Sequence, residues 1–327
     1  MKRYIKMVAA LLGLLASFTA CENGDQTFDD YEGGTTVMFV YQSPVRTIVL
    51  GDDEYDTSID KEHKCKIKAT FAGSYNGRKG YVNVAVDNSL CDHLTFADGT
   101  PVKAMPAEYY SLSTNKLDFK GGMTGETVVQ LTDAFFNDPD AVKNTYVIPL
   151  AMTDQQGFDR ISAGTLKEGA TGSRTNAAIW ETAPKDYVMY CVKYQNKYSG
   201  WWLTHHNTST DNIEKASKVQ ITTRTLNSSV YSVEFQEGST IYKADLLLTF
   251  DANEKCTITS LTDGVTATGT GSWADDALLS WNNKYRDLME LNAEITFAGG
   301  VKKNLNEKLV WWRSGVTKEE FSFTYNN

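Results

Sequence analysis

The stretch Lys64-Cys65-Lys66-Ile67-Lys68-Ala69-Thr70-Phe71 alternates polar and apolar side chains almost without a break. Successive side chains of a strand point to opposite faces, so this alternation predicts a β-strand with one buried face. The same period of two recurs in both halves of the chain, and turn dipeptides such as Asn76-Gly77 separate the runs. The sequence therefore predicts an all-β protein of antiparallel strands. The other alternating runs are residues 82–86, 148–152, 219–221, 231–235, 244–248 and 293–297.

A stretch rich in Gly, Ser, Thr and Ala, residues 162–178, interrupts this alternation. A shift in composition of this kind indicates a boundary between domains. We expect a first domain over residues 35–175 and a second over residues 176–327, because each is long enough to bury its own core. Short helices are expected near residues 133–144 and 277–288.

The N-terminus has the three-part layout of a signal peptide. Its first residues are basic, residues 7–15 are apolar, and small residues precede Cys21. Residues 1–21 resemble a bacterial lipoprotein signal, in which the cysteine is acylated and becomes the mature N-terminus. An ordinary secretory signal with an incidental cysteine is the alternative. Residues 22–34 are polar and rich in acids, which is typical of a flexible tether.

The chain is acidic, with 32 Lys and Arg against 41 Asp and Glu and a net charge of −9. Loss of the signal peptide, which holds three basic residues and no acidic one, changes the net charge to −12. Such a surface repels phosphate backbones, so nucleic acid is excluded as a partner. The four cysteines beyond Cys21 lack the spacing of a zinc site. We expect buried free thiols, and disulfides Cys65–Cys91 and Cys191–Cys256 are the alternative.

Several phrases of the chain resemble one family of bacterial proteins. Residues 106–112, 130–139 and 146–150 are similar to the immunoglobulin-like N-terminal domain of Bacteroidetes surface lipoproteins, and residues 187–201 and 309–315 to the β domain that follows it. The resemblance covers nearly all of the mature chain. It implies an immunoglobulin-like β-sandwich followed by a second antiparallel β domain. It also implies a lipid-anchored, surface-exposed location in the outer membrane and a place in a polysaccharide-utilisation system.

The second domain contains Gly200-Trp201-Trp202, which resembles the Gly-x-Trp motif that opens lipocalin-like barrels. In such barrels a late basic residue packs over the tryptophan, and Arg313 is the residue that matches here. A closed calycin-like barrel is one expectation for this domain. An open β-sandwich is the other.

The sequence lacks the motifs of common catalytic sites. His205 and His206 are adjacent, and adjacent strand residues point to opposite faces, so they cannot bind one metal together. There is no nucleophile elbow, no metalloprotease motif and no phosphate-binding loop. The acids from Asp52 to Asp60 lack the order of an EF-hand, and we expect a solvated loop there rather than a calcium site. No catalytic residue, metal or cofactor is expected.

Aromatic residues are the stronger functional signal, since six of the seven tryptophans lie at or beyond position 201. Four of them form two adjacent pairs, Trp201-Trp202 and Trp311-Trp312. Alternation on a strand turns one member of each pair away from the core. We expect Trp202 in the core and Trp201 outside it. An exposed ring offers a platform for the C–H face of a sugar, and polar neighbours receive the sugar's hydroxyls. The expected ligand-binding residues are Trp201, His205, His206, Asn207, Trp273, Trp281 and Trp311.

Together these features predict a non-catalytic, cell-surface glycan-binding lipoprotein of a polysaccharide-utilisation system. Its expected partners are an oligo- or polysaccharide, the outer membrane through the lipid on Cys21, and other surface proteins of glycan uptake. Two alternatives remain open. One is a glycoside hydrolase or another glycan-active enzyme, and the other is a structural or adhesive surface lipoprotein.

Overall fold

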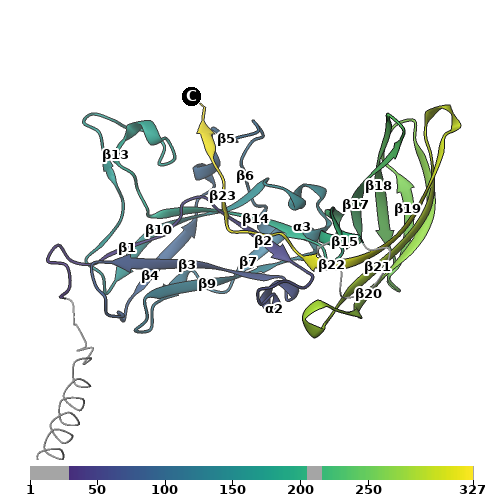
Figure 1. Ribbon diagram of the computed structural model, residues 1–327. Coiled ribbons are helices and arrows are strands. Elements are labelled where there is room, and N and C mark those ends of the chain that lie inside the picture. The colour runs from purple at the N-terminus through teal and green to yellow at the C-terminus, as the bar shows by residue number, and fades with distance from the viewer. Residues whose placement is uncertain (1–28, 205–215, 327) are drawn as a thin grey trace, which may run out of the picture.

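The computed structural model describes residues 29–204 and 216–326, and they fold into two β domains (Figure 1). The expected all-β class is confirmed, because the described residues contain two short α-helices, α2 (Ser58–Lys61) and α3 (Asp133–Asn137), among more than twenty strands. In the described part of the chain, no helix is long and apolar enough to cross a membrane. The expected lipidation site, Cys21, lies outside the described residues.

The first domain is a sandwich of two sheets. One sheet has the strand order β11 (Arg160–Ile161), β1 (Thr36–Met38), β3 (Lys64–Ala72), β9 (Thr124–Leu131) and β7 (Tyr110–Leu112). The other has the order β23 (Glu319–Glu320), β2 (Pro44–Val49), β14 (Tyr187–Gln195), β10 (Tyr146–Gln156), β4 (Tyr81–Val86) and β8 (Lys116–Asp118), with β6 (Lys103–Ala104) also paired to β10.

The alternation that predicted β3 reappears as the inner face of this sandwich. Cys65, Ile67, Ala69 and Phe71 are buried and belong to one hydrophobic core with residues of the opposite sheet, such as Ile148. Burial of such side chains is the main stabilising contribution to a two-layer fold. The four described cysteines are buried free thiols, so the disulfide alternative is wrong.

The second domain is a closed barrel of eight antiparallel strands in sequence order (Figure 1). The calycin-like alternative is therefore confirmed, and the open sandwich is not. Gly269 and Gly271 let two neighbouring strands approach closely, because a Cβ at Gly269 would lie 2.3 Å from the carbonyl oxygen of Asn292. The strands are β15 (Gly200–Thr204), β16 (Ser217–Thr225), β17 (Ser228–Glu237), β18 (Thr240–Phe250), β19 (Lys255–Ser260), β20 (Thr266–Ser280), β21 (Lys284–Thr296) and β22 (Lys302–Arg313).

Trp202 lies where β15 pairs with β22 and closes the barrel. Its side chain is fully buried, and its Nε1 donates a hydrogen bond of 3.2 Å to the carbonyl of Tyr198, as expected for the core position of the motif. The expected contact of Arg313 with this ring is not found. Arg313 is the last, exposed residue of β22, and its guanidinium lies 4.3 Å from the ring centroid of Trp312 instead.

One of the two expected helices is present in part. Residues 133–144 form α3 and a separate 3-10 turn, η3 (Pro139–Val142), because Pro139 interrupts the backbone hydrogen bonding. The helix expected at 277–288 is wrong. Those residues complete β20, form the turn η6 (Trp281–Asn283) and begin β21, so apolar Leu278 and Leu279 belong to a long hairpin.

The boundary expected at residue 176 lies too early. β14 pairs with β10 and β2 of the sandwich, so the first domain continues to Gln195 and the barrel begins at Gly200. The final segment then returns to the first domain, where β23 pairs with β2 and β24 (Phe323–Tyr325) pairs with β5 (Leu94–Phe96) (Figure 1). The barrel is thus an insertion between two strands of the sandwich. Within and just after the stretch rich in Gly, Ser, Thr and Ala, β12 (Thr165–Leu166) and β13 (Trp180–Thr182) form a small two-stranded sheet.

Buried Asn196 fastens the connection between the domains. Its side-chain amide donates to the carbonyls of Thr225 at 2.7 Å and Ser228 at 3.0 Å, both in or next to the first strands of the barrel. Its Oδ1 accepts from the hydroxyl of Ser199 at 2.7 Å. Because these groups are buried, their hydrogen bonds fix the chain as it leaves β14.

Candidate functional site

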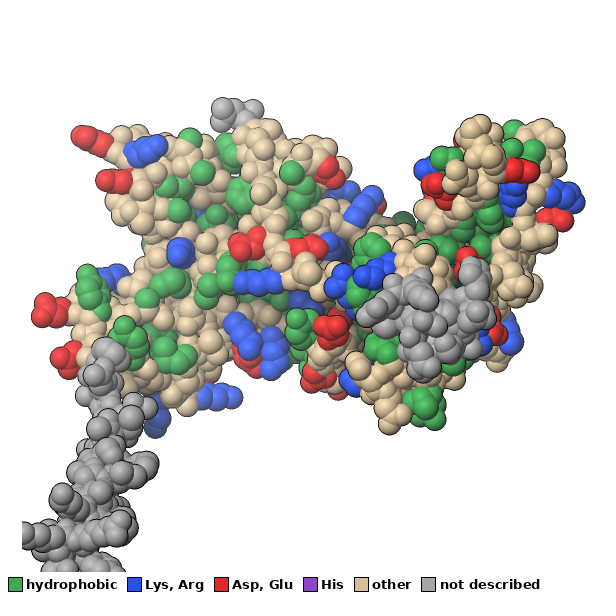
Figure 2. Space-filling view, viewed as in Figure 1, with side chains coloured by type: hydrophobic (Ala, Val, Ile, Leu, Met, Phe, Trp, Pro, Cys, Tyr) green, Lys and Arg blue, Asp and Glu red, His purple; other side chains and the backbone are tan. Residues whose placement is uncertain are grey.

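A pocket of about 620 Å³ lies between the two domains. Its first wall is the loop of residues 52–57 that joins β2 to α2, and its second is built from the β20–β21 hairpin and the end of β22. Figure 2 shows acidic side chains on the surface around α2, where this loop approaches the barrel. Pockets of this size commonly hold small ligands, and they occur preferentially at domain interfaces.

The loop of the first wall is held by one polar contact to the barrel end and two within the first domain. The hydroxyl of Ser314, just after β22, donates to Oδ2 of Asp53 at 2.6 Å. Lys61 of α2 pairs with Asp52 at 2.7 Å, and the hydroxyl of Thr57 donates to the carbonyl of Gly51 at 3.1 Å. These contacts give the loop a defined shape.

Two tyrosines present open rings to the pocket, one from each domain. Tyr55 of the loop is 74% exposed, and Tyr285 at the start of β21 is 62% exposed. Large aromatic rings left in solvent at a concave surface are typical of binding sites. Tyr55 and Tyr285 are thus placed to stack on a ligand that enters between the domains.

Two of the three tryptophans that line the pocket, Trp281 and Trp312, are already in contact with cations. The guanidinium of Arg286 lies 3.9 Å from the ring centroid of Trp281. The ring of Trp312 has Lys218 Nζ at 4.1 Å and the guanidinium of Arg313 at 4.3 Å. These cation–π contacts hold both rings in place, so a ligand would contact the rings' remaining surface and the cations themselves.

Asp287 is the most deeply buried carboxylic acid of the pocket, with 3% of its surface exposed. Its Oδ1 accepts a hydrogen bond of 3.1 Å from the backbone N–H of Asp276. The pKa of Asp287 is raised to about 7, mainly by burial and also by the neighbouring charges of Asp275 and Asp52, against the lowering effect of the hydrogen bond from Asp276. Asp287 is therefore the acid in this pocket that exchanges a proton near neutral pH.

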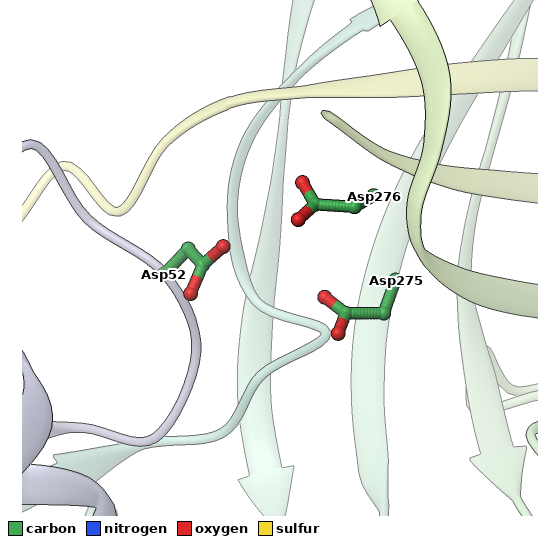
Figure 3. Close-up of side chains that lie close together, drawn as sticks. All are labelled: Asp52, Asp275 and Asp276. Carbon is green, nitrogen blue, oxygen red and sulfur yellow. The ribbon is translucent and has the colours of Figure 1, made fainter. Parts of the chain in front are cut away.

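Asp52, Asp275 and Asp276 bring their carboxylates together from the two sides of the pocket (Figure 3). Oxygen atoms of the three lie within 4.8 Å of one another, which is close enough to share one divalent cation. Lys61 already pairs with Asp52, and exposed carboxylates also gather in this way without a metal, so we assign no ion here.

The acidic run that sequence analysis treated as a solvated loop divides into two parts. Asp52 and Asp53 line the pocket. Asp60 instead lies buried beside Arg46, pairs with its guanidinium, and accepts from the backbone N–H of Val49 at 2.8 Å. Burial raises the pKa of Asp60, against the opposing effects of these two partners. The pairing with Arg46 makes Asp60 a structural residue rather than a calcium ligand.

The pocket brings together two of the expected platform residues, Trp281 and Trp311. Trp281 is partly exposed. Trp311 is largely buried in the barrel core, and the outward member of that doublet is Trp312, which the site prediction did not include. Which of Trp311 and Trp312 faces outward depends on the register of β22, and alternation alone does not determine that register.

The other expected platform residues do not line this pocket. Trp273 packs in the barrel core, edge-on to Tyr198 at 5.6 Å. The ring of Trp201 is partly covered by the chain after β22, since a Cβ at Gly315 would lie 2.6 Å from it. Three expected hydroxyl-binding residues, His205, His206 and Asn207, lie outside the described residues.

Sequence analysis missed the residues that characterise the pocket, namely Tyr55, Tyr285, Arg286 and Asp287. A signal existed for some of them. An aromatic residue stands within the acidic run at position 55, and another, Tyr285, stands among charged residues shortly after Trp281. Nothing in the sequence indicated that these two segments face each other.

No curated protein matches this chain. A protein-family model described as a domain of unknown function, DUF5627, matches residues 187–315. A second family model, described as an N-terminal domain, matches residues 30–159. Among solved structures, a Bacteroides ovatus multidomain protein that includes DUF1735 is 12% identical, covering 84% of this chain and 91% of its own, with a TM-score of 0.39. A candidate carbohydrate-binding protein from B. ovatus ATCC 8483 is 11% identical, covering 89% and 98%, with a TM-score of 0.26. Likenesses this weak carry no functional argument.

A third solved structure is much more similar. It is a Bacteroides ovatus protein of unknown function that is 30% identical to this chain, with a TM-score of 0.81. The match covers 91% of this chain and all of the other, so both domains and their arrangement are shared. The chain therefore belongs to the same family as this two-domain Bacteroides protein.

Proposed function

We propose that this protein is a non-catalytic glycan-binding protein and that the pocket between its domains is the binding site. The observation that carries the proposal is the pair of exposed rings, Tyr55 and Tyr285, that enter one pocket from different domains. A ligand that covers both rings removes apolar surface from water at each of them.

The remaining chemistry of the pocket supports a sugar in particular. A sugar has apolar C–H faces and a rim of hydroxyl groups, so it needs aromatic rings and hydrogen-bond acceptors together. Carboxylates such as Asp53 and Asp276 are strong acceptors for hydroxyl groups. An apolar ligand such as a lipid would cover these carboxylates without donating a hydrogen bond to them, and that would be costly.

The cellular part of the proposal rests on the sequence. The signal layout ending at Cys21 and the acidic tether after it support a lipid-anchored protein on the outer face of the outer membrane. There the pocket would hold polysaccharide for a polysaccharide-utilisation system, beside other surface proteins of glycan uptake. The tether of residues 22–34 would keep the domains at a distance from the membrane.

One observation favours a second candidate, a glycoside hydrolase. Such enzymes use a carboxylic acid with a raised pKa together with a second carboxylate, and Asp287 has a raised pKa beside other acids. The burial of Asp287 argues against this role. Its carboxyl group has almost no contact with solvent and is bound by the backbone of Asp276, so a glycosidic oxygen has no direct approach to it.

A glycan array with the chain from residue 22 onward tests both candidates. We expect retention of at least one oligo- or polysaccharide, and loss of that retention in the double variant Tyr55→Ala, Tyr285→Ala. Tyr75→Ala is the matched control, because Tyr75 is equally exposed and does not line the pocket. Mass spectrometry of the bound glycans should show no shorter products. Cleavage that disappears in Asp287→Asn would favour the hydrolase, and no retention of any glycan would refute the binding function.

A further inference from the structure

Arg286 is a charged group of the pocket without a polar partner in the described chain. Its guanidinium stacks on Trp281, and its Nε is buried with no hydrogen-bond acceptor. Among the described residues, no carboxylate lies within ion-pair distance of it. Burial accordingly lowers the pKa of Arg286, and Glu54 opposes this only through its more distant charge.

An unpaired donor of this kind is unfavourable. Removing a cation from water costs free energy unless an acceptor or a counter-charge replaces the water, and stacking on a ring supplies no acceptor for Nε. Buried donors in native proteins usually have an acceptor, and an orphan in a ligand-sized pocket indicates where the acceptor of a ligand would lie. Lys284, on the same wall, also lacks a carboxylate partner in the described chain.

The acids of the facing loop are, by contrast, partly satisfied within the protein. Asp52 pairs with Lys61, and Asp53 accepts from the hydroxyl of Ser314. The wall formed by this loop therefore offers carboxylates as acceptors for hydroxyl groups. The hairpin wall offers Asp276 as a further acceptor and also a cation, Arg286, that needs an oxyanion or another acceptor.

We propose that the pocket selects a glycan that contains a uronic acid, whose carboxylate pairs with Arg286. The inference rests on the proposed glycan-binding function and names its substrate class. A carboxylate matches the fork of N–H donors on a guanidinium and supplies the missing charge, whereas a neutral hydroxyl supplies neither. The hydroxyl groups of the same glycan would then face Asp53 and Asp276.

Matched pairs of acidic and neutral sugars test this by calorimetric titration. The probes are oligosaccharides of galacturonate, mannuronate and guluronate and glucuronate-substituted xylan, each compared with its carboxyl-reduced form. The reduced form keeps the rings and linkages and loses only the negative charge. With the chain from residue 22 onward, we expect at least one acid form to bind and its reduced form to bind at least about tenfold more weakly, as for a charge-assisted bidentate pair.

Variants of Arg286 assign the effect to this side chain. Arg286→Ala should weaken binding of the acid form at least about tenfold and weaken binding of the reduced form much less, so that the preference for the acid form is lost. Arg286→Lys should retain part of the preference because it keeps the charge without the fork. Arg224→Ala is the matched control, since Arg224 is an exposed arginine of β16 that does not line the pocket. Melting temperatures identify a variant that does not fold, and Arg286→Lys then carries the test.

Three results would overturn the inference. The first is equal binding of the acid and reduced forms. The second is unchanged affinity for the acid form in folded Arg286 variants. The third is preference for a sulfated oligosaccharide without uronic acid over every uronate. If only neutral sugars bind and the tyrosine variants abolish that binding, the proposed function holds and the uronate inference fails. If no sugar of either class binds, both fail.

Discussion

The hydroxyl of Ser314 donates a 2.6 Å hydrogen bond to the carboxylate of Asp53, and this bond joins the end of the barrel to a loop of the sandwich. The two residues are 261 positions apart in the sequence. Their contact places the first wall of the pocket against the second. A wall that is already positioned loses less conformational entropy when a ligand binds.

Ser314→Ala should therefore weaken glycan binding while leaving the fold intact. Loss of one hydrogen bond to a charged group costs about 1.5–3 kcal/mol where it is buried, and the partial exposure of this one places the effect near 1 kcal/mol, or roughly fivefold in affinity. Calorimetric titration of a bound glycan measures this loss. Ser232→Ala is the control, because the hydroxyl of Ser232 makes an equally short bond to Asp245 on the exposed barrel surface. Equal loss of glycan affinity in the two variants would contradict the claim that the bond between Ser314 and Asp53 positions the loop for binding.

Tyr55→Ala and Tyr285→Ala should each reduce glycan affinity by about 1–2 kcal/mol, roughly five- to thirtyfold, because each removes one stacking surface. The melting temperature should change little, since both rings are mainly in solvent. Affinity is measured by titration and stability by thermal unfolding. Unchanged affinity in both variants would show that the ligand does not contact these rings.

The two members of the first tryptophan doublet should differ in stability. Trp202→Ala should cost roughly 3–5 kcal/mol, because a fully buried ring leaves a cavity where the barrel closes. Trp201→Ala should cost less and leave glycan affinity unchanged, because Trp201 is partly exposed and does not line the pocket. Urea unfolding curves of the two variants measure the difference. A larger loss for Trp201→Ala would invert the assignment of their faces.

Asp287 should make the stability of the protein depend on pH. The unfolded chain releases this proton near the usual pKa of 3.8, whereas the folded protein keeps it until the pKa of about 7. Between these values the folded state binds more protons, so the free energy of unfolding should fall as pH rises toward 7. Asp287→Asn should remove this slope and be more stable than the native chain above pH 7, by an amount on the order of 1–3 kcal/mol.

Urea unfolding at pH 4 to 8 measures this effect. Asp263→Asn serves as the control, because Asp263 is an exposed acid in a turn. Parallel curves for native chain and Asp287→Asn across the whole range would show that Asp287 ionises as easily when folded as when unfolded.

Cys21→Ala should release the protein from membranes. The variant removes the residue that the signal layout predicts to be acylated, and without acyl chains the acidic domains have no affinity for a lipid surface. Fractionation of cells that express each form, followed by a high-salt wash, gives the measurement. Retention of the variant in the washed membrane fraction would contradict lipid anchoring at this position.

The period of two was sufficient to predict the class of the fold, because each strand of a two-layer protein buries one face. It identified β3 residue by residue, and the Gly-x-Trp motif identified the core role of Trp202. It did not identify the pocket. Tyr55 and Tyr285 are 230 positions apart in the sequence, and their meeting depends on how two separately folded domains are oriented.

The local sequence pattern also failed to predict features that depend on the register between strands. A helix was expected near residues 277–288, but a register shift between Ala274 and Leu278 lets the β20–β21 hairpin continue through Leu278 and Leu279. The outward member of the second doublet was likewise decided by the register of β22 with its neighbours, which placed Trp311 inside and Trp312 outside.

The return of the last residues to the sandwich determines the order in which the protein is completed during synthesis. β23 and β24 leave the ribosome after the barrel strands, whereas their partners, β2 and β5, leave it early. All eight barrel strands are made before them. The barrel can therefore close while β2, at the edge of the sandwich, and β5, in a separate two-stranded sheet, are still unpaired, so the domain whose synthesis begins first is finished after the barrel.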